Sequence, residues 1–309
     1  MTTALITHPA CLLHETPPGH PERPARLSEV LKQLDAPEFT ALKRKEAPKA
    51  TQAMIARVHD ADFVEDVLAA IPKSGYAQID ADTVASPGSG EAALRAAGAV
   101  VQGVDLVMSG EVKNAFCAVR PPGHHATQVR AMGFCLFNSV AVAAAHARDA
   151  HGLKKIAVVD FDVHHGNGTQ AMFTADPNLF YASTHQSPLY PGTGRADETG
   201  VAHNIVNVPL PPGAGSTEFR RAFELVILPA LERFAPELLI ISAGFDAHRD
   251  DPLAQLRLDE TDYGWATEKL CGVAARVCQG RVVSALEGGY DLQATARSAG
   301  AHVRAMMAA

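Results

Sequence analysis

The chain has 309 residues, of which 47% are hydrophobic and 20% are charged, a balance that is ordinary for a globular protein and excludes long disordered stretches. Its 27 basic and 34 acidic residues give a net charge of −7 without a cluster of Lys or Arg, so direct binding to nucleic acid is not expected. The 5 cysteines include no CxxC pair, which indicates neither a disulfide framework nor a cysteine-based zinc site.

Apolar runs of strand length recur along the whole chain. In order, they cover residues 5–7, 115–119, 156–159, 179–182, 205–208, 238–241 and 281–286. They are unbroken rather than alternating, which is typical of strands that are buried on both faces. Helical patterns lie between them, at 52–71, 89–108, 138–151, 217–234, 260–279 and 293–307. Since strands and helices alternate, we expect one α/β domain over residues 1–309, with a parallel sheet flanked by helices on both faces.

Three segments carry additional signals. The Ala-rich stretch 138–151 is apolar almost all round, which predicts a buried helix. Pro229 interrupts the pattern at 217–234 and is expected to kink that helix. The segment 42–49 is short and mildly basic, and we expect it to form a solvated surface loop.

The residues that follow the strands carry the chemistry, because ligands of parallel sheets bind outside the carboxyl ends of the strands. After the run 156–159 comes Asp-Phe-Asp-Val-His-His-Gly-Asn-Gly (160–168). Alternate residues of an extended chain share a face, so Asp160, Asp162 and His164 can point the same way. Carboxylates and an imidazole at this spacing suit a divalent metal ion.

Three other strand ends bear complementary polar side chains. Asp246 follows the sixth predicted strand and is either a third metal ligand or a helix N-cap. A rigid Pro-Pro-Gly loop after the second strand presents His124 and His125, and two glycines after the last strand precede Tyr290. Two Asp and one His make a three-ligand zinc set with positions open for water and substrate. The histidine pair and the tyrosine can supply the base, the acid and the oxyanion donor that hydrolysis requires.

At these positions the sequence resembles the histone deacetylase superfamily, which includes bacterial deacetylase-like amidohydrolases and acetylpolyamine amidohydrolases. The resemblance runs in order from about residue 19 to about residue 300. It is carried by the strings Arg-Pro-Pro-Gly-His-His-Ala (120–126), Gly-Phe-Cys-Leu-Phe-Asn (133–138), 160–169, Gly-Phe-Asp-Ala-His (244–248) and Glu-Gly-Gly-Tyr (287–290). The implied architecture is the arginase/deacetylase α/β fold, in which helices flank one eight-stranded parallel sheet.

The resemblance also implies a role for each site residue. One zinc ion would have three protein ligands: Asp162, His164 and Asp246. His125 would act as general base and then as general acid, while His124, paired with Asp160, would supply positive charge near the metal. Tyr290 would hydrogen-bond the substrate carbonyl and its tetrahedral oxyanion.

A narrow acyl tunnel is implied as well, with walls formed by Gly133, Phe134, Tyr190, Leu253 and Gly289. Asn167 follows His-His-Gly where class I enzymes carry Asp, and this form is similar to class II enzymes and their bacterial relatives. Asn167 would orient His125 by a hydrogen bond. Leu253 stands where the polyamine-selective eukaryotic branch carries Glu, which favours acyl-lysine substrates over acetylpolyamines.

The same resemblance implies a structural monovalent cation, usually potassium. Its ligands would come from Asp160, Asp162, His164, Ser183 and Thr184. A second site of this kind would lie near Phe173, Asp176 and Leu179.

Further polar residues lie next to these motifs. We expect His165 to support the metal ligands from the second layer around the ion, and Asp250 and Asp251 to cap loops. Three residues that precede a helix are expected either at the tunnel rim or in a helix cap: His20, Glu22 and Arg23.

The sequence therefore predicts a zinc-dependent deacylase acting on an acylated primary amine such as acyl-lysine. The nearest alternative is an acetylpolyamine amidohydrolase with the same chemistry. Two others are a non-catalytic binding protein with the same fold and an arginase-like manganese hydrolase, which would need carboxylates where His164 and His165 stand.

The expected partner is a small acylated amine or an acyl-lysine peptide, and a homo-oligomer is compatible with the sequence. The N-terminus lacks a basic region followed by a long apolar one, so no signal peptide is expected. No run of ~18 apolar residues is present, so we expect no membrane segment and a cytoplasmic protein.

Overall fold

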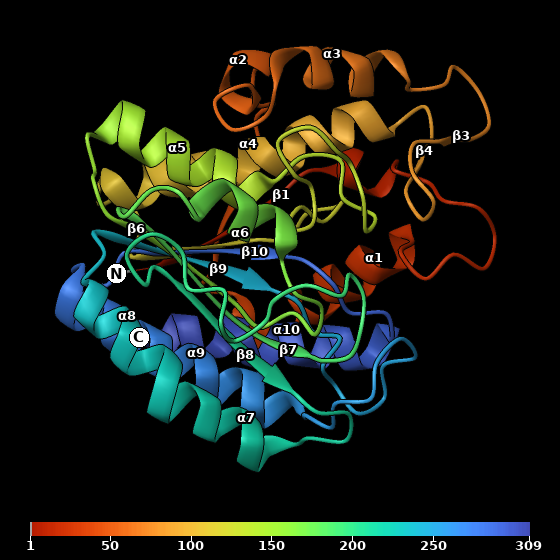
Figure 1. Ribbon diagram of the computed structural model, residues 1–309. Helices are drawn as coiled ribbons and strands as arrows, with labels where there is room; N and C mark the ends of the chain where they lie inside the picture. The colour runs from red at the N-terminus through yellow and green to blue at the C-terminus, as the bar shows by residue number, and fades with distance from the viewer. Residues whose placement is uncertain (1) are drawn as a thin grey trace.

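Eight parallel strands form one sheet at the centre of the computed structural model, which describes residues 2–309 (Figure 1). The strand order across the sheet is β2-β1-β5-β10-β9-β6-β7-β8, and every pairing in it is parallel. In chain order the strands are β1 (Thr3–Thr7), β2 (Lys43–Glu46), β5 (Asn114–Cys117), β6 (Ile156–Asp160), β7 (Leu179–Gln186), β8 (Ile205–Leu210), β9 (Leu238–Ala243) and β10 (Val282–Leu286). The expected eight-stranded parallel sheet is confirmed.

Helices cover both faces of this sheet. In Figure 1, α2 to α6 lie above it and α7 to α10 lie below it, with α1 packed beside α10. The helices are α1 (Pro24–Gln33), α2 (Gln52–Ile55), α3 (Ala61–Ala69), α4 (Ser89–Met108), α5 (Ser139–His151), α6 (Asn167–Phe173), α7 (Ser216–Ala222), α8 (Leu228–Phe234), α9 (Glu260–Val277) and α10 (Leu292–Ala308). Because both faces are covered, central strands such as β9 are buried along their whole length, which explains their unbroken apolar runs.

The buried helices begin and end close to the predicted residues. α4 spans the predicted 89–108, and α5 lies within the predicted 138–151. Asn138 caps α5 by accepting a hydrogen bond from the Ala141 N–H. Gly152 ends the helix with φ of 67°, a left-handed conformation that glycine adopts readily.

Two of the predicted helices are interrupted in the structure. The segment 52–71 forms α2 and α3 instead of one helix, because Asp60 caps a new helix by accepting from the Asp62 N–H. The segment 217–234 contains a π-helical turn, Phe223–Ile227, between α7 and α8. Pro229 lacks the N–H that a regular helix would use at that position, so the turn adjusts the backbone just before it.

The segment 42–49 was expected to be a loop, and this expectation was wrong for its centre. Lys43–Glu46 form the edge strand β2, paired with β1. Its side chains alternate between partial burial and exposure, and charged residues are well suited to an edge strand because they hinder pairing with another chain. The helix expected after Arg23 is α1, whereas α6 and the small antiparallel pair β3 (Ala77–Gln78) and β4 (Val84–Ala85) were not predicted.

None of the helices within residues 2–309 combines the length and the apolar character needed to cross a membrane.

Candidate active site

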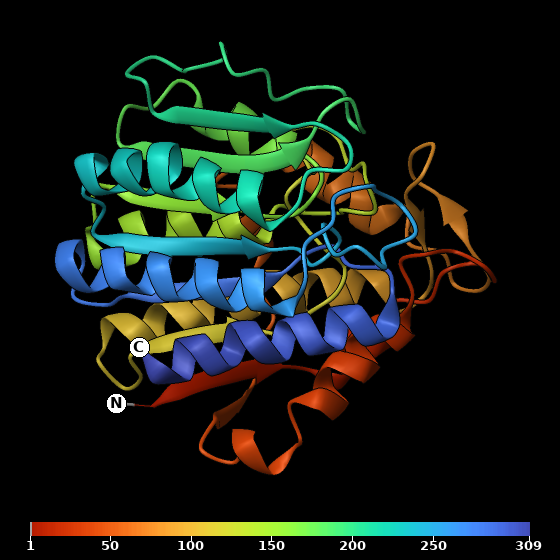
Figure 2. The same ribbon diagram turned by 90° about the horizontal axis from the view of Figure 1, so that it is seen from below.

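The candidate site lies where four neighbouring strands end. β5, β10, β9 and β6 are adjacent and parallel, so their carboxyl ends meet at one edge of the sheet, where loops gather (Figure 2). The loops that follow them carry His124 and His125, Tyr290, Asp246 and the segment 160–168. Residues that are far apart in the sequence thus converge where parallel sheets bind their ligands.

Asp162, His164 and Asp246 form a compact group of potential metal ligands. One donor atom from each lies within 4.8 Å of the others, and all three residues are buried. His164 Nδ1 is 3.1 Å from Asp162 Oδ1 and 3.1 Å from Asp246 Oδ2. The other carboxylate oxygens accept backbone hydrogen bonds of 2.8 Å, from Gly288 to Asp162 and from Val163 to Asp246. One oxygen of each carboxylate is thereby directed at the imidazole, as the ligands of a single ion require.

The electrostatics of this group favour a bound cation. Burial and the neighbouring Asp162 raise the pKa of Asp246. Although burial opposes it, Asp162 and Asp246 raise the pKa of His164 to about 10. A divalent ion at this position would compensate both carboxylates and take the place of the His164 proton. The three side chains therefore fit a metal ion.

His124 is held as a cation beside this group. Its Nδ1 lies 2.9 Å from Asp160 Oδ2. Although burial opposes the charged form, the carboxylates of Asp162 and Asp160 raise the pKa of His124 well above its usual range. The buried imidazole thus carries a positive charge at the edge of the metal-ligand group.

His125 is held as a neutral base only 4.0 Å from the His124 ring, measured between ring centroids. Burial, together with the charges of His124 and His164, keeps the pKa of His125 well below its usual range. The His125 Nδ1–H donates to Asn167 Oδ1 over 2.8 Å. This hydrogen bond leaves the lone pair on Nε2, which is the form that a general base requires.

A buried carboxylate to which the sequence analysis gave no role holds the histidine loop. Glu287 Oε2 accepts the backbone N–H of Gly123 at 2.6 Å and that of His124 at 3.2 Å. Burial raises the pKa of Glu287 to about 7. The loop after β5 is therefore fixed by the end of β10, and the only sequence signal for this contact was the position of Glu287 in the Glu-Gly-Gly-Tyr string.

A cavity of about 240 Å³ opens onto these residues. Four of the residues that were expected to form the tunnel lie on its wall, together with the expected oxyanion donor Tyr290: Gly133, Phe134, Tyr190 and Leu253. Gly133 has φ of 58°, and a Cβ there would lie 2.3 Å from His125 Cδ2, so a larger residue would displace the imidazole. Phe134 packs edge-on against Tyr290, with ring centroids 5.8 Å apart.

The wall differs from the expectation at three positions. Gly289 does not line the cavity; an added Cβ there would instead lie 2.7 Å from Thr295 Oγ1, away from the opening. Asp82 and Leu189 do line it, although neither was expected. Asp82 Oδ1 accepts the Gly133 N–H over 3.0 Å, which fixes this carboxylate against the wall. It lies in the turn between β3 and β4, a segment without an apolar run or a motif, so no local sequence pattern pointed to it.

Two flanking polar residues, His165 and Asp251, make contacts that were not expected from the sequence. The ring nitrogens of His165 contact Thr193 Oγ1 at 2.7 Å and Gln170 Oε1 at 2.8 Å, so His165 supports the loop that carries Tyr190. Asp250 is exposed. Asp251 accepts the Leu253 N–H as a loop cap would, but it is buried and accepts the Tyr290 N–H as well.

Glu22 is neither a rim residue nor a helix cap, because it is the centre of a buried ion network. It pairs with Arg26 at 2.9 Å, with His14 at 3.3 Å and with Arg120. All four side chains are buried. Although burial opposes its ionisation, Arg120 and His14 hold the pKa of Glu22 well below its usual range.

The same network supports the Tyr290 loop from below. Arg26 donates to the carbonyl oxygens of Gly289 and Glu287. Its guanidinium carbon lies 4.8 Å from the centre of the Tyr290 ring. Arg26 therefore links the ion network to the phenol that faces the cavity.

Replacing Glu22 by Gln is expected to lower the free energy of unfolding by ~3–5 kcal/mol, because the guanidinium groups of Arg26 and Arg120 would lose their buried counter-charge. Urea unfolding of the purified protein measures this change. Glu38→Gln, which removes the exposed ion pair with Arg304, is the matched control and is expected to change the value by ~0–1 kcal/mol. Equal effects of the two variants would contradict the importance of the buried network.

The implied monovalent-cation site shares Asp162 and His164 with the metal-ligand group, and its other residues are Asp160, Ser183 and Thr184. Asp160 of β6 and Ser183 of β7 are paired in register, and both are fully buried. Ser183 Oγ lies 2.9 Å from His185 Nδ1. The neighbouring Thr184 is also buried.

The backbone carbonyl oxygens implied around the second cation do converge, but they surround the side-chain amide of Asn204. Phe173, Asp176 and Leu179 accept hydrogen bonds from the Asn204 Nδ2 group over 2.9, 3.0 and 2.8 Å. A cation at this position would have to displace that amide. These residues therefore do not fit a second cation in the arrangement that the structure shows.

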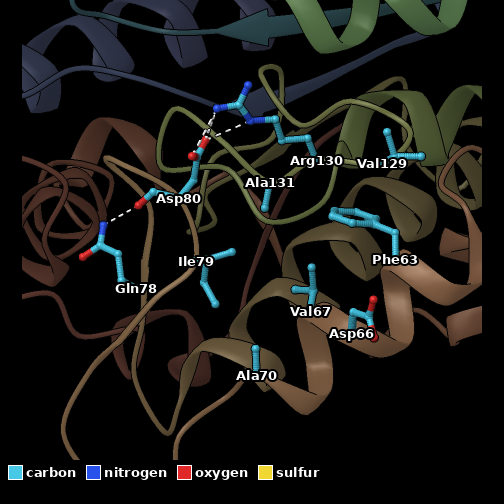
Figure 3. A pocket seen from close by; sticks show the side chains of 10 residues that line it. All are labelled: Phe63, Asp66, Val67, Ala70, Gln78, Ile79, Asp80, Val129, Arg130 and Ala131. Carbon is cyan, nitrogen blue, oxygen red and sulfur yellow. Dashed lines mark hydrogen bonds and ion pairs between the residues drawn. The ribbon is translucent and has the colours of Figure 1, made fainter.

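A larger hollow lies away from the metal-ligand group. This groove has a volume of about 310 Å³. It is lined by Phe63 and Val67 of α3 and by residues around β3 and the 129–131 segment (Figure 3). Its charged side chains are Asp66 and the ion pair between Asp80 and Arg130. This set offers no histidine or tyrosine and no cluster of metal ligands, so the smaller cavity at the strand ends is the candidate active site.

Comparisons with known proteins agree with this geometry. A family model for the histone deacetylase domain matches residues 20–306. The chain is 41% identical to an uncharacterised protein of Synechocystis over 299 residues, which cover 96% of each chain. It is 39% identical over 278 residues to the histone deacetylase-like amidohydrolase of Pseudomonas aeruginosa, covering 88% of this chain and 73% of the relative.

A solved structure is similar over nearly the whole chain. The crystal structure of the HDA15 HD domain matches with a TM-score of 0.94 and 38% sequence identity, covering 99% of this chain and 88% of that one. The fold is therefore that of histone deacetylase domains, as the resemblance implied. The chain belongs to the histone deacetylase family.

Proposed function

We propose that the protein is a zinc-dependent deacylase that hydrolyses the amide between a short acyl group and a primary amine. The observation that carries this proposal is a single cavity lined by His125, Tyr290 and His164, the last of which belongs to the three-ligand metal set. Relatives named as deacetylases and amidohydrolases support the class of reaction.

The metal would be held by Asp162, His164 and Asp246, two carboxylates and one imidazole in an arrangement that leaves room for water and substrate. When bound, zinc supplies Lewis-acid polarisation of the substrate carbonyl and acidifies water. A structural potassium ion beside Asp160 and Ser183 belongs to the same proposal, supported by the burial of both side chains and their pairing in register.

The chain's own residues supply the proton transfers and the oxyanion donor. His125 accepts a proton at Nε2 as water attacks, because its Nδ1–H is committed to Asn167. It then returns that proton to the departing amine. Tyr290 donates its phenolic O–H to the substrate oxygen, where negative charge develops. His124 remains protonated and adds a fixed positive charge nearby.

Acyl-lysine is the substrate class that the cavity wall favours. Leu253 contributes an apolar side chain to the wall, and such a residue suits the peptide that flanks an acylated lysine. One observation favours acetylpolyamines as the second candidate, since the Asp82 carboxylate also lies on the wall and can pair with a second ammonium group. We further propose that the protein is cytoplasmic and that it acts on small amines or peptides without a nucleic-acid or membrane partner. A homo-oligomer is compatible with this function.

The purified protein is expected to hydrolyse an acetyl-lysine peptide with a higher kcat/KM than acetylspermidine. Leu253→Glu should shift this preference toward the polyamine, because a charged hydrogen bond that is partly desolvated contributes ~1–3 kcal/mol. Leu253→Gln is the matched control, since it has a similar size without the charge. A tenfold or greater preference of the wild type for acetylspermidine would overturn the lysine assignment and leave the polyamine candidate.

A further inference from the structure

Asp251 is a buried carboxylate that no step of the proposed reaction uses. It lies in the loop after β9, and only 7% of its surface is exposed. Oδ2 accepts the backbone N–H of Tyr290 over 2.7 Å, and Oδ1 accepts that of Leu253 over 2.9 Å. Both oxygens of one side chain are therefore bound to residues that line the cavity.

The position of Tyr290 depends on few other contacts. Among residues 2–309, the hydrogen bonding of Tyr290 is limited to its backbone N–H, which leaves the phenolic O–H available for a substrate. Gly289, directly before it, has φ of 121°, a conformation that glycine reaches with little restraint from a side chain. Within the described residues 2–309, the only hydrogen bond made by Tyr290 itself is the one to Asp251, and the ring rests on Phe134 and Arg26.

We propose that Asp251 is a positioning residue, which holds Tyr290 at the distance from the reacting carbonyl that the proposed reaction requires. This inference rests on the proposed function for the role of Tyr290. The carboxylate joins the β10 loop to the β9 loop, so the oxyanion donor and Leu253 move together. A carboxyl group is well suited to this task, because its two oxygens can each accept a backbone N–H from a different loop.

A simple loop cap would explain the contact to Leu253 but not the contact to Tyr290. A cap stabilises the fold, and its removal lowers stability without acting through one catalytic group. A positioning residue acts through Tyr290, so its effect disappears once the phenolic O–H is gone. A double-mutant cycle separates the two cases.

The experiment compares Asp251→Asn, Tyr290→Phe and the double variant, with Asp250→Asn as the matched control. Asp250 is the adjacent carboxylate, but it is exposed and contacts no residue of the cavity wall. Asp251→Asn is expected to lower kcat by ~10–10²-fold with little change in KM, the effect of a displaced catalytic group. In the Tyr290→Phe background the same change should cost less than ~3-fold, and Asp250→Asn should leave kcat unchanged.

Three measurements keep the test independent of folding and of the proposed reaction. Zinc content and thermal unfolding are determined for each variant, and hydrogen exchange of the Tyr290 amide reports directly on the bond to Asp251. Faster exchange in Asp251→Asn than in Asp250→Asn supports the positioning role even if Asp251→Asn is partly unstable. Equal exchange, or the same fold-loss of kcat with and without the phenol, overturns it. Failure of the proposed function itself would show differently, as full turnover by Tyr290→Phe.

Discussion

Treatment with a chelator is expected to remove one zinc ion per chain and to abolish amide hydrolysis, and added zinc is expected to restore it. The three donors lie within 4.8 Å of one another, and all three residues are buried. Asp246→Asn keeps the shape of a ligand but removes its charge. It should reduce turnover by more than the ~10–100-fold that losing an outer supporting residue costs. Elemental analysis beside kcat measures both effects.

The chain offers a matched control for this experiment. Asp105, His146 and His151 form the other Asp/His group within 4.8 Å in residues 2–309, on the surface where α4 meets α5. Both imidazoles lie 2.7 Å from the same Asp105 oxygen, so their polar atoms are satisfied without an ion. Asp105→Asn should change neither zinc content nor turnover. Full activity of metal-free protein, or two catalytic ions per chain, would refute the assignment.

Tyr290→Phe is expected to lower kcat by ~10²–10³-fold, the typical loss when one oxyanion donor is removed. KM should change little, because the donor acts mainly on the charge that develops in the transition state. Folding and zinc content should be preserved, since the phenolic oxygen makes no hydrogen bond within residues 2–309. Steady-state kinetics, with unfolding curves as the check on structure, give the comparison.

Tyr190→Phe removes a second phenolic hydroxyl from the same cavity, so it controls for the general loss of a polar group from the cavity wall. Tyr190 is 39% exposed, and its ring lies edge-on to His125 with centroids 5.2 Å apart. Its variant should lose far less activity than Tyr290→Phe. If both phenols proved equally important, or if Tyr290→Phe kept near wild-type turnover, Tyr290 would not be the oxyanion donor.

The sheet and the site motifs were predictable because their signals are local. A strand buried on both faces must be apolar throughout, so β6, β9 and β10 are visible as unbroken runs. The polar strings that follow such runs mark the carboxyl edge of a parallel sheet. β2 was missed for the opposite reason, since an edge strand with charged side chains has no apolar run.

The pairs His124–Asp160 and His125–Asn167 were implied by the family resemblance. The other supports of the site were not predictable, because they connect residues that are distant in the sequence. Glu22 and Arg120 are 98 positions apart, and each alone looks like an exposed charged residue. Burial of such groups is compatible with folding only when they are paired, and the pairing exists only in the folded chain. Asp82 and Asp251 follow the same rule, since their partners Gly133 and Tyr290 lie in other loops.

The side-chain amide of Asn204 holds the turn between α6 and β7 with a donor that belongs to the chain itself. A free ion that binds only the folded protein stabilises it in proportion to the logarithm of its concentration, so dilution or dialysis removes the benefit. Asn204 is covalently attached directly before β8, and its Nδ2 group reaches the three carbonyl oxygens that would otherwise face such an ion. Dialysis cannot remove this donor, so the stability of the turn is expected not to change with the concentration of a monovalent ion.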